Sequence, residues 1–533
     1  MKILTASSLD KIFPNGGVTL PERSGVMLQN ERYHFQIAVC QDNVFGRQDA
    51  QVQLIGDIAD FCTVRAVDCS PALFNRYPDA DDYYIFTSDD ARLYPDVLRE
   101  ENSAYLPMRL WAAFWVTVHS ENGIPAGKHT LKIKLCSGGE VLGETEYTVE
   151  VLAASLPKSD LIHTCWMHYD AIANYYRLAP WSREYYKKFE SFLSHAVSHG
   201  MNMLYVPLFT PPLDTCIGGE RLDVQLLKIT KRGSSYRFDL SELEKFLDFA
   251  LSHGVEYFEM CHLATQWGAA HCPKIMAHTE NGYEQIFGWN SLSTSEEYLD
   301  FLRACLGEID TLLRKKGIAK KCYFHISDEP DATNIDRYKE VYHAIAPILK
   351  NYKLMDAVSD AGRDLIDVPV VSTTHLKGEC AANEFAYYCC SAHSEYLSNR
   401  FLDMPSLRNR ILGCQLWLNK ANGFLHWGFN FYNDRGSVRS IDPFRVTDAL
   451  GHFPGGDGFV VYPGCGGAWD SLRLEVFYDA LQDRMLLKEL EKKLGRATLV
   501  KILNDYGIRG WTEYPHTETA FIAFNANLKR MLV

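Results

Sequence analysis

Lys321-Cys322-Tyr323-Phe324-His325-Ile326-Ser327-Asp328-Glu329-Pro330 is the stretch that decides the fold of this 533-residue chain. Its apolar first half, with aromatic and branched residues, predicts a short buried strand. The strand ends in two adjacent carboxylates, and Pro330 then stops it. The amphipathic segment that follows, at about 334–350, predicts a helix. A strand, a charged tip and a helix form the unit from which (β/α) barrels are built, and chemistry in such barrels collects at the C-terminal ends of the strands.

The chain from Leu161 onward alternates segments that resemble strands with segments that resemble helices. Strands are expected at 162–169, 202–208, 256–263, 322–327, 353–358, 369–373, 385–390 and 424–431. Helical patterns lie at 183–199, 241–253, 295–315, 334–349, 404–419 and about 471–494. Eight strands that alternate with helices predict an α/β fold, a (β/α)8 barrel of the TIM type, with the acidic pair at the end of the fourth strand.

The first part of the chain is different, because short alternating strands are separated there by Gly and Pro turns. Expected strands at 111–118, 130–135 and 145–152 are typical of a β-sandwich. The sequence therefore predicts three parts: an N-terminal β-sandwich domain at 1–157, a catalytic barrel at 158–500, and a C-terminal segment at 501–533 packed on the barrel.

The composition narrows the class of protein. The net charge is −13 and there is no run of Lys or Arg, so nucleic acid is not expected as a partner. No apolar stretch reaches the length of a membrane span, so membrane insertion is not expected either. The fifteen cysteines form no disulfide framework, and the first residues lack the apolar region of a signal peptide. We therefore expect a cytoplasmic protein; no oligomeric state is predicted.

The adjacency of Asp328 and Glu329 restricts the chemistry that they can perform. Successive side chains on a strand point to opposite faces, so both acids reach one pocket only if the chain turns at the strand end. Ordinary retaining glycosidases hold two carboxylates about 5–5.5 Å apart, usually on different strands. An adjacent pair suits a substrate-assisted glycosidase, in which one acid protonates the leaving oxygen and the other orients a 2-acetamido nucleophile. When Asp328 and Glu329 are considered alone, the alternative is that they mark the start of a helix, where acidic residues complement the helix dipole.

Polar and aromatic residues also follow other expected strands, and a glycine-rich loop at 455–464 could close the pocket. Flat aromatic faces suit sugars, whereas the sequence has no HExxH motif or Cys/His cluster and no nucleotide fingerprint. We therefore expect no metal and no organic cofactor. For the individual Trp and His residues, packing in the core remains the alternative. The candidate substrate-binding residues are His168, His262, Trp267, Trp427, Asn430, Tyr432 and Asp457.

Several stretches together resemble glycoside hydrolase family 123, whose characterised members are β-N-acetylgalactosaminidases. They are Phe324-His325-Ile326-Ser327-Asp328-Glu329-Pro330, His199-Gly200-Met201-Asn202, Phe209-Thr210-Pro211-Pro212-Leu213-Asp214, Gln266-Trp267-Gly268-Ala269, Ile286-Phe287-Gly288-Trp289, Gly423-Phe424-Leu425-His426-Trp427-Gly428, Gly456-Asp457-Gly458-Phe459-Val460-Val461-Tyr462-Pro463-Gly464 and Ser471-Leu472-Arg473-Leu474-Glu475. The similarity spans about residues 160–490 and includes the order of a β-sandwich before a barrel.

The resemblance implies roles for the two acids. Asp328 matches the acid that orients the 2-acetamido group and stabilises the oxazolinium, and Glu329 matches the general acid/base. Partial burial beside a negative Asp328 would keep the proton on Glu329 at neutral pH. The expected activity is an exo-acting, retaining β-N-acetylhexosaminidase, with GalNAc as the sugar and a glycan or glycoconjugate as substrate. The alternatives are a glycosidase of another specificity and a non-catalytic carbohydrate-binding protein on the same barrel.

Overall fold

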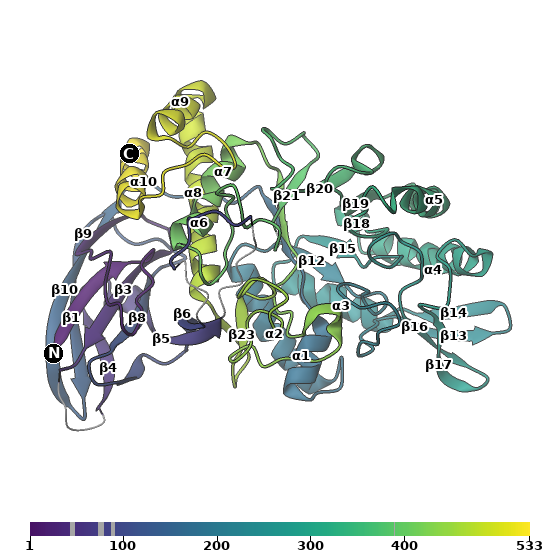
Figure 1. Cartoon of the computed structure of the whole chain (residues 1–533), viewed down its shortest axis with the longest axis horizontal. Helices are drawn as coiled ribbons and strands as arrows, with labels where there is room; N and C mark the ends of the chain where they lie inside the picture. Colours follow the sequence, from purple (N-terminus) through teal and green to yellow (C-terminus); the bar gives the residue numbers. More distant parts are fainter. Residues whose placement is uncertain (43–47, 73–78, 87–90, 389) are drawn as a thin grey trace.

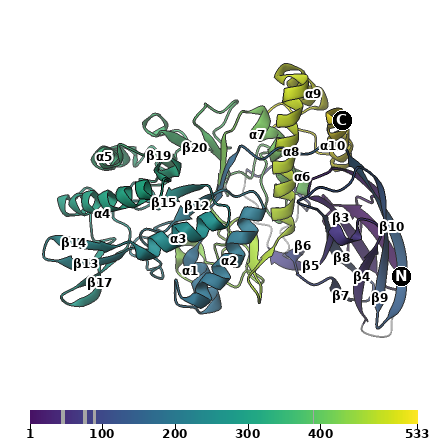
Figure 2. The same ribbon diagram turned by 180° about the vertical axis from the view of Figure 1, so that it is seen from behind.

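The computed structural model describes residues 1–42, 48–72, 79–86, 91–388 and 390–533. A β-sandwich forms one end of the molecule and a barrel the other, with helix α8 (Leu472–Leu494) between them (Figure 1). Figure 2 shows the same order from behind. The mixed α/β fold with a sandwich before a TIM-type barrel is thus confirmed. Residue 389, within the strand expected at 385–390, lies outside the described residues.

The sandwich consists of two five-stranded sheets. One has the order β1 (Lys2–Ser7), β3 (Tyr33–Cys40), β8 (Trp111–Val118), β5 (Cys62–Ala72) and β6 (Arg92–Leu98). The other has the order β2 (Ser24–Leu28), β10 (Glu140–Leu152), β9 (Gly127–Ser137), β4 (Gln48–Ile55) and β7 (Ser103–Leu106), and the short helix η1 (Ala59–Phe61) precedes β5. Strand β9 alternates: Leu131, Ile133 and Leu135 are buried in the core, and the lysines between them are not. The predicted strands 111–118, 130–135 and 145–152 all lie within these sheets.

Eight parallel strands form the barrel, and each coincides with a strand expected from the sequence. They are β11 (Ile162–Cys165), β12 (Met203–Val206), β15 (Tyr257–Met260), β18 (Cys322–Phe324), β19 (Lys353–Ala357), β20 (Val368–Ser372), β21 (Phe385–Tyr387) and β22 (Gly423–His426). Asn202 bridges the seam between β11 and β12. Its backbone N–H donates to the His163 carbonyl at 3.1 Å, and its side chain bonds the His163 N–H at 2.9 Å and the Leu161 carbonyl at 3.0 Å.

Helices cover the barrel, though not after every strand. They are α1 (Tyr169–Tyr176), α2 (Arg183–Ser198), α3 (Ser241–Ser252), α4 (Glu296–Lys315), α5 (Ile335–Ile345) with η3 (Ala346–Leu349), α6 (Ser406–Arg410) and α7 (Leu412–Leu418). In α4, Leu302, Leu306, Ile309 and Leu313 recur every three or four residues and are buried against the strands. The connection from β19 to β20 holds only η4 (Arg363–Leu365), because a segment of this length barely spans a parallel crossover.

A small additional sheet projects from the barrel at the end away from the sandwich (Figure 1). It has the order β14 (Ser235–Asp239), β13 (Lys228–Arg232), β16 (Ile275–Thr279) and β17 (Gly282–Phe287), from the segments that follow β12 and β15. Tyr236 and Phe238 pack on Phe301 of α4. None of the strands expected from the sequence lies in this sheet.

The C-terminal elements link the two ends of the molecule. After η5 (Arg435–Ser437), the hairpin of β23 (Val461–Pro463) and β24 (Ala468–Asp470) leads into α8, and α9 (Arg496–Tyr506) and α10 (Glu518–Leu532) follow. Helix α10 lies between the sandwich and α8, because Lys529 Nζ donates to the Val26 carbonyl of β2 at 3.0 Å and Asn525 donates to Asp483 of α8 at 2.6 Å. The domain boundaries stay predictions.

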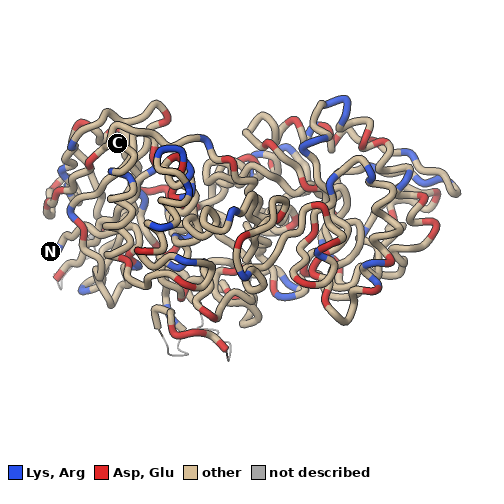
Figure 3. The backbone as a smooth tube through the Cα atoms, turned by 90° about the horizontal axis from the view of Figure 1, so that it is seen from above, with Lys and Arg blue, Asp and Glu red and all other residues tan. Residues whose placement is uncertain are grey.

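Residues of both charge signs occur throughout the chain. Lys and Arg are interspersed with Asp and Glu along the chain rather than gathered on one face (Figure 3). Within the part of the chain that the structure describes, no helix combines the length and the hydropathy needed to cross a membrane.

Candidate active site

A pocket of about 430 Å³ opens at the C-terminal ends of the barrel strands. Asp328 and Glu329 follow β18, Ala357 ends β19, Tyr387 ends β21, and Leu425 lies on β22. Segments after other strands complete the wall. The lining residues are Trp166, Leu213, Asp214, Gln266, Trp267, Asp328, Glu329, Ala357, Tyr387, Cys390, Leu425, Trp427, Arg435, His452 and Phe453. The predicted position of the acidic pair, at the end of the fourth strand, is confirmed.

Both acids face this pocket because the backbone turns between them. Glu329 has φ of +44°, a left-handed conformation that a residue with a Cβ adopts only when its surroundings impose it. The Glu329 N–H donates to the carbonyl of Ala357 at 3.0 Å, which ties the turn to the end of β19. The turn that the sequence analysis required at this strand end is therefore present.

Asp328 is the buried member of the pair, with 4% of its surface exposed. Gln266 donates to its Oδ2 at 2.7 Å, and its Oδ1 has no hydrogen-bond partner among the residues that the structure describes. Burial and the neighbouring charge of Glu329 raise the pKa of Asp328 well above its usual range, against the hydrogen bond from Gln266. An unpartnered carboxylate oxygen in a pocket is an acceptor for a donor group that a ligand brings.

Glu329 is the exposed member of the pair. The hydroxyl of Tyr387 donates to its Oε1 at 2.9 Å and fixes the carboxyl at the pocket wall. Partial burial was expected for Glu329, and this expectation is wrong, because the turn at its own Cα directs the side chain toward solvent and leaves Asp328 inside.

Several residues at the pocket or beside it have a strained backbone. Asp214, Trp267 and Ala269 join Glu329 with positive φ, at +42°, +54° and +56°. The Trp267 N–H donates to the carbonyl of Asp328 at 3.2 Å, and Gln266 Oε1 accepts the N–H of Asp214. Such conformations cost about 1–3 kcal/mol each and cluster where ligands bind. Trp267 is held at the mouth, with 48% of its surface exposed.

A buried charged network lies beneath the pocket. Glu259 of β15 accepts from Trp166 Nε1 at 3.1 Å and lies 2.9 Å from His325 Nε2. Asp356 of β19 accepts the N–H of Ile326 at 2.9 Å and lies 3.3 Å from His325 Nδ1. Burial alone would lower the pKa of His325, but its hydrogen bonds to the two carboxylates raise it to about 9. The resulting imidazolium fixes the strand three residues before Asp328.

Trp427 forms the opposite wall and is held from behind by several candidate residues. Asp457 accepts from Trp427 Nε1 at 3.0 Å, and burial raises the pKa of Asp457 to about 7. His168 Nε2 lies 3.0 Å from the Trp427 carbonyl, and Asn430 Oδ1 accepts the His168 N–H at 2.8 Å. The wall is therefore braced by hydrogen bonds rather than by apolar packing alone.

The structure thus divides the candidate residues into two groups. Asp328, Glu329, Trp267 and Trp427 line the pocket. The others lie outside the lining: His168, Asn430 and Asp457 support Trp427, Tyr432 Oη donates to the Val461 carbonyl at 2.9 Å, and His262 Nδ1 lies 2.9 Å from Tyr205 Oη. Their role in substrate binding stays a prediction.

A family model described as "Glycoside hydrolase 123, catalytic domain" matches residues 166–490. The chain belongs to glycoside hydrolase family 123. The structure is similar over 100% of this chain and 97% of the other to a family 123 glycoside hydrolase from Clostridium perfringens, studied for glycolipid glycan hydrolysis, with a TM-score of 0.73 and 15% identity. A family 39 glycoside hydrolase from Bacteroides cellulosilyticus covers 89% of this chain and 82% of its own, with a TM-score of 0.31 and 7% identity. No curated protein matches the sequence.

Membership of family 123 confirms the resemblance and supports glycan hydrolysis as the activity of the pocket. Sequence reasoning missed several lining residues in this family 123 site: Asp214, Tyr387, Arg435, His452 and Phe453. Asp214 ends one of the stretches that resemble family 123, and this resemblance was the signal that could have identified it. Tyr387 ends an apolar strand, where a tyrosine is expected to be buried in the core.

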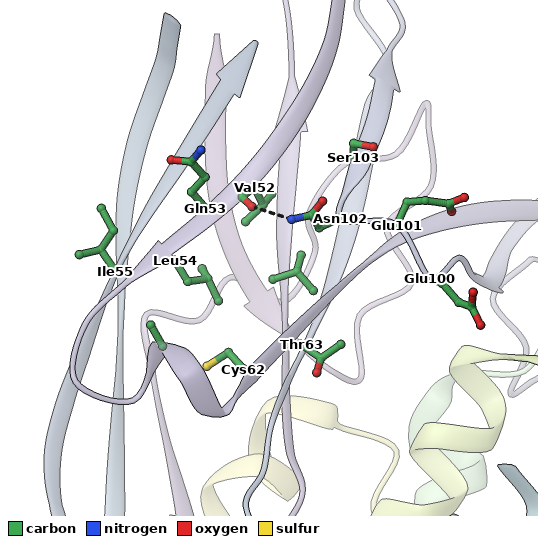
Figure 4. Close-up of a pocket in the computed structure, with 12 residues that line it drawn as sticks. Val52, Gln53, Leu54, Ile55, Cys62, Thr63, Glu100, Glu101, Asn102 and Ser103 are labelled. Carbon is green, nitrogen blue, oxygen red and sulfur yellow. Dashed lines mark hydrogen bonds between the residues drawn. The ribbon is translucent and has the colours of Figure 1, made fainter. Parts of the chain in front are cut away.

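Two other kinds of site need separate consideration in this family 123 chain. A cavity of about 760 Å³ lies in the sandwich, between β4, β5 and the start of β7 (Figure 4). None of its lining residues is aromatic, and its two acids, Glu100 and Glu101, are at the edge, so it lacks the features of a sugar site.

Among the described residues, two groups could hold a metal ion: His262, His325 and Asp356 beneath the pocket, and His199, Asp470 and Glu475 at the barrel's other end.

Proposed function

We propose that this family 123 glycoside hydrolase removes terminal β-linked N-acetylhexosamine, GalNAc above all, with retention of configuration and with the substrate's 2-acetamido group as nucleophile. The observation that carries the proposal is the pair Asp328 and Glu329, adjacent in sequence and turned into one pocket. An acid pair on one side of the sugar cannot straddle C1 as the two carboxylates of an ordinary retaining enzyme do.

In the first step, Glu329 donates its proton to the glycosidic oxygen as the bond from C1 to that oxygen breaks. The acetamido carbonyl oxygen bonds to C1 and an oxazolinium forms. Asp328 Oδ1, to which none of the described residues donates, accepts the acetamido N–H and faces the positive charge that develops on the ring. In the second step, water attacks C1 as the bond from C1 to the acetamido oxygen breaks and the acetamido group re-forms. Glu329 takes the proton from the water, and the hemiacetal leaves with retained configuration.

The assignment to a terminal sugar is supported by the shape of the site. A pocket of about 430 Å³ is at the small end of ligand sites, and Trp267 stands half exposed at its mouth. Trp427, braced by Asp457, offers a second aromatic face. We keep the cytoplasm as the proposed location, because the fifteen cysteines of the sequence have no spacing typical of a disulfide framework.

A panel of nitrophenyl β-glycosides of GalNAc, GlcNAc and galactose tests the function. The proposal expects release from the N-acetyl sugars, fastest from GalNAc, and none from galactose, which lacks the nucleophile. Asp328→Asn should abolish turnover and weaken binding of a thiazoline that mimics the oxazoline, because the positive ring loses its charge partner. Galactosides cleaved as fast as GalNAc glycosides would favour another specificity.

A second experiment separates mechanism from specificity. Deoxyfluoro sugars that trap glycosyl esters should leave the enzyme unlabelled in mass spectra, because no ester forms. A sugar adduct on a carboxylate would instead show that the enzyme uses the two-carboxylate mechanism, in which an enzyme carboxylate is the nucleophile. Glycan binding without turnover of any aryl glycoside would favour the non-catalytic alternative.

A further inference from the structure

The wall of the pocket contains a cation that the proposed mechanism does not use. Arg435 is the first residue of η5, lines the pocket and is exposed. Within the part of the chain that the structure describes, its guanidinium forms no hydrogen bond and no ion pair. The five N–H donors of this arginine are therefore available to a ligand.

The charges near Arg435 do not account for it. Arg221, a buried arginine of the same region, is paired, because its Nε donates to Asp170 at 2.9 Å. Burial raises the pKa of Asp214, and the positive charges of Arg221 and Arg435 oppose this shift. Arg435 thus lies within electrostatic reach of Asp214, although no ion pair between these two described residues is formed.

The backbone that carries Arg435 is held against the pocket. The Gly436 N–H donates to Asp214 Oδ2 at 3.2 Å, and the Ser437 hydroxyl donates to the Asp214 carbonyl at 2.8 Å. The Cys216 N–H donates to the Gly436 carbonyl at 3.0 Å. Gly436 and Ser437 adopt positive φ, at +73° and +54°, to make this turn. Because Asp214 lines the pocket itself, the turn fixes the Arg435 backbone beside the site and leaves the side chain free to adjust to a ligand.

His452 is a second donor in the same wall. It lines the pocket, is exposed, and its ring has no hydrogen-bond partner among the described residues. Its N–H donates to the Asp448 carbonyl at 3.0 Å, and the ring of the next residue, Phe453, lies 5.3 Å from that of Trp427. His452 therefore belongs to the segment that packs on the Trp427 wall, and an imidazole always has at least one N–H to donate.

We propose that Arg435, with His452 as a second donor, binds an oxyanion of the substrate in the pocket: a sulfate ester on the terminal N-acetylhexosamine, or the carboxylate of the sugar to which it is linked. This inference rests on the proposed function and narrows its substrate class to anionic glycans. The planar guanidinium offers two parallel N–H groups to such an oxyanion, a geometry that a sugar hydroxyl does not match.

The charge of the pocket explains why an anionic substrate needs this arginine. Three carboxyl groups line the site, those of Asp214, Asp328 and Glu329, and each of them in its ionised form repels an anion. A neutral sugar meets no such repulsion and gains less from a cation. Arg435 therefore acts on specificity, because it favours the charged substrate over the neutral one.

The experiment compares substrates that differ only in the oxyanion. One set is nitrophenyl β-GalNAc with its 4-O-sulfate and 6-O-sulfate, and the other is GalNAc β-linked to glucuronic acid or to glucose. The parent enzyme should have the higher kcat/KM for the anionic member of one set, and that set identifies the source of the oxyanion. Arg435→Gln should lower the ratio of anionic to neutral kcat/KM by about 10- to 150-fold, the effect of losing hydrogen bonds between charged groups.

Two further variants make the comparison specific. Arg435→Lys keeps the charge and loses the planar fork, so its ratio should fall between those of the parent and Arg435→Gln. Arg439→Gln is the matched control, because Arg439 lies outside the pocket lining and is 3.3 Å from Asp434; it should keep the parent ratio.

Two results would overturn the proposal: no preference for either anionic member in the parent, or equal losses for both members of each set in Arg435→Gln. The second result would mean that Arg435 acts on Asp214 rather than on the substrate. Calorimetric titration with the same glycosides at low temperature separates this inference from the proposed function. If no glycoside is cleaved, the proposed function fails, and weaker binding of only the anionic glycosides by Arg435→Gln would still support the oxyanion site, whereas equal binding by both proteins would overturn it.

Discussion

Gln266 makes the hydrogen bond that the structure describes for the Asp328 carboxylate, and removing it is a sharp test of the active site. Gln266→Met deletes the donor 2.7 Å from Asp328 Oδ2 while keeping a side chain of similar size. Hydrogen bonds to charged groups contribute about 1.5–3 kcal/mol. At one factor of ten per 1.4 kcal/mol, the ionised form of Asp328 is disfavoured by roughly 10- to 150-fold.

Gln266→Met is therefore expected to shift the pH dependence of kcat/KM rather than to lower kcat/KM equally at every pH. Burial and Glu329 already raise the pKa of Asp328, and the lost hydrogen bond raises it further. If Asp328 must be ionised to stabilise the oxazolinium, the acidic limb of kcat/KM moves to higher pH and activity returns as the pH rises. The assay is a profile of kcat/KM against pH with an aryl GalNAc glycoside.

Two further variants isolate the cause. Gln266→Glu keeps the oxygen that accepts the Asp214 N–H but adds a negative charge. The acidic limb of its kcat/KM profile should therefore move to higher pH at least as far as that of Gln266→Met. Gln225→Met changes a glutamine that also bridges two backbone segments but lies outside the pocket, and it should leave the limb in place. A loss in Gln266→Met that is equal at every pH would refute the electrostatic reasoning.

Three other predictions address the same pocket. Glu329→Gln should lower turnover by about 10²–10⁴-fold for substrates with poor leaving groups and far less for activated aryl glycosides, and equal losses would contradict its role as acid. Trp267→Ala should weaken substrate binding by about 0.5–1.5 kcal/mol without lowering Tm, whereas a large fall in Tm with unchanged KM would make it a packing residue. Asp328→Asn should raise the free energy of unfolding at neutral pH, because the raised pKa of Asp328 means that ionising this carboxyl destabilises the folded state. Denaturant titrations should show that this gain in stability disappears below about pH 4, where the carboxyl is protonated in the unfolded state too.

The sequence predicted the eight barrel strands because each is a short apolar run between turn signals. It did not predict the sheet of β13, β14, β16 and β17, since Lys228–Arg232 and Ser235–Asp239 are mostly polar and bury few residues. Gly233, with φ of +56°, was the local sign of that hairpin. Polar strands that fold onto a helix of the barrel leave little periodicity in their own residues.

The candidate site could be predicted where chemistry and strand position coincide, as at Asp328 and Glu329. Prediction was weaker for residues such as His168 and Asn430, which follow strands but turn back to brace Trp427. A polar residue at a strand end can serve the ligand or the wall that holds the ligand, and only the path of the loop decides between them. Which acid is buried depended likewise on a single backbone turn, at Glu329.

Helix α8 has a consequence for how the two halves of this chain can be recombined. Its Arg473 pairs with Asp96 of the sandwich at 2.9 Å, and its Glu475 pairs with Arg65; all four side chains are largely buried. Removing one partner of a buried ion pair costs about 3–5 kcal/mol, so losing both pairs approaches the whole stability of an ordinary domain, about 5–15 kcal/mol. A chimera that joins this barrel to the sandwich of another protein must therefore carry the matching residues of both sides, and the sandwich is inherited with the barrel rather than exchanged as a module.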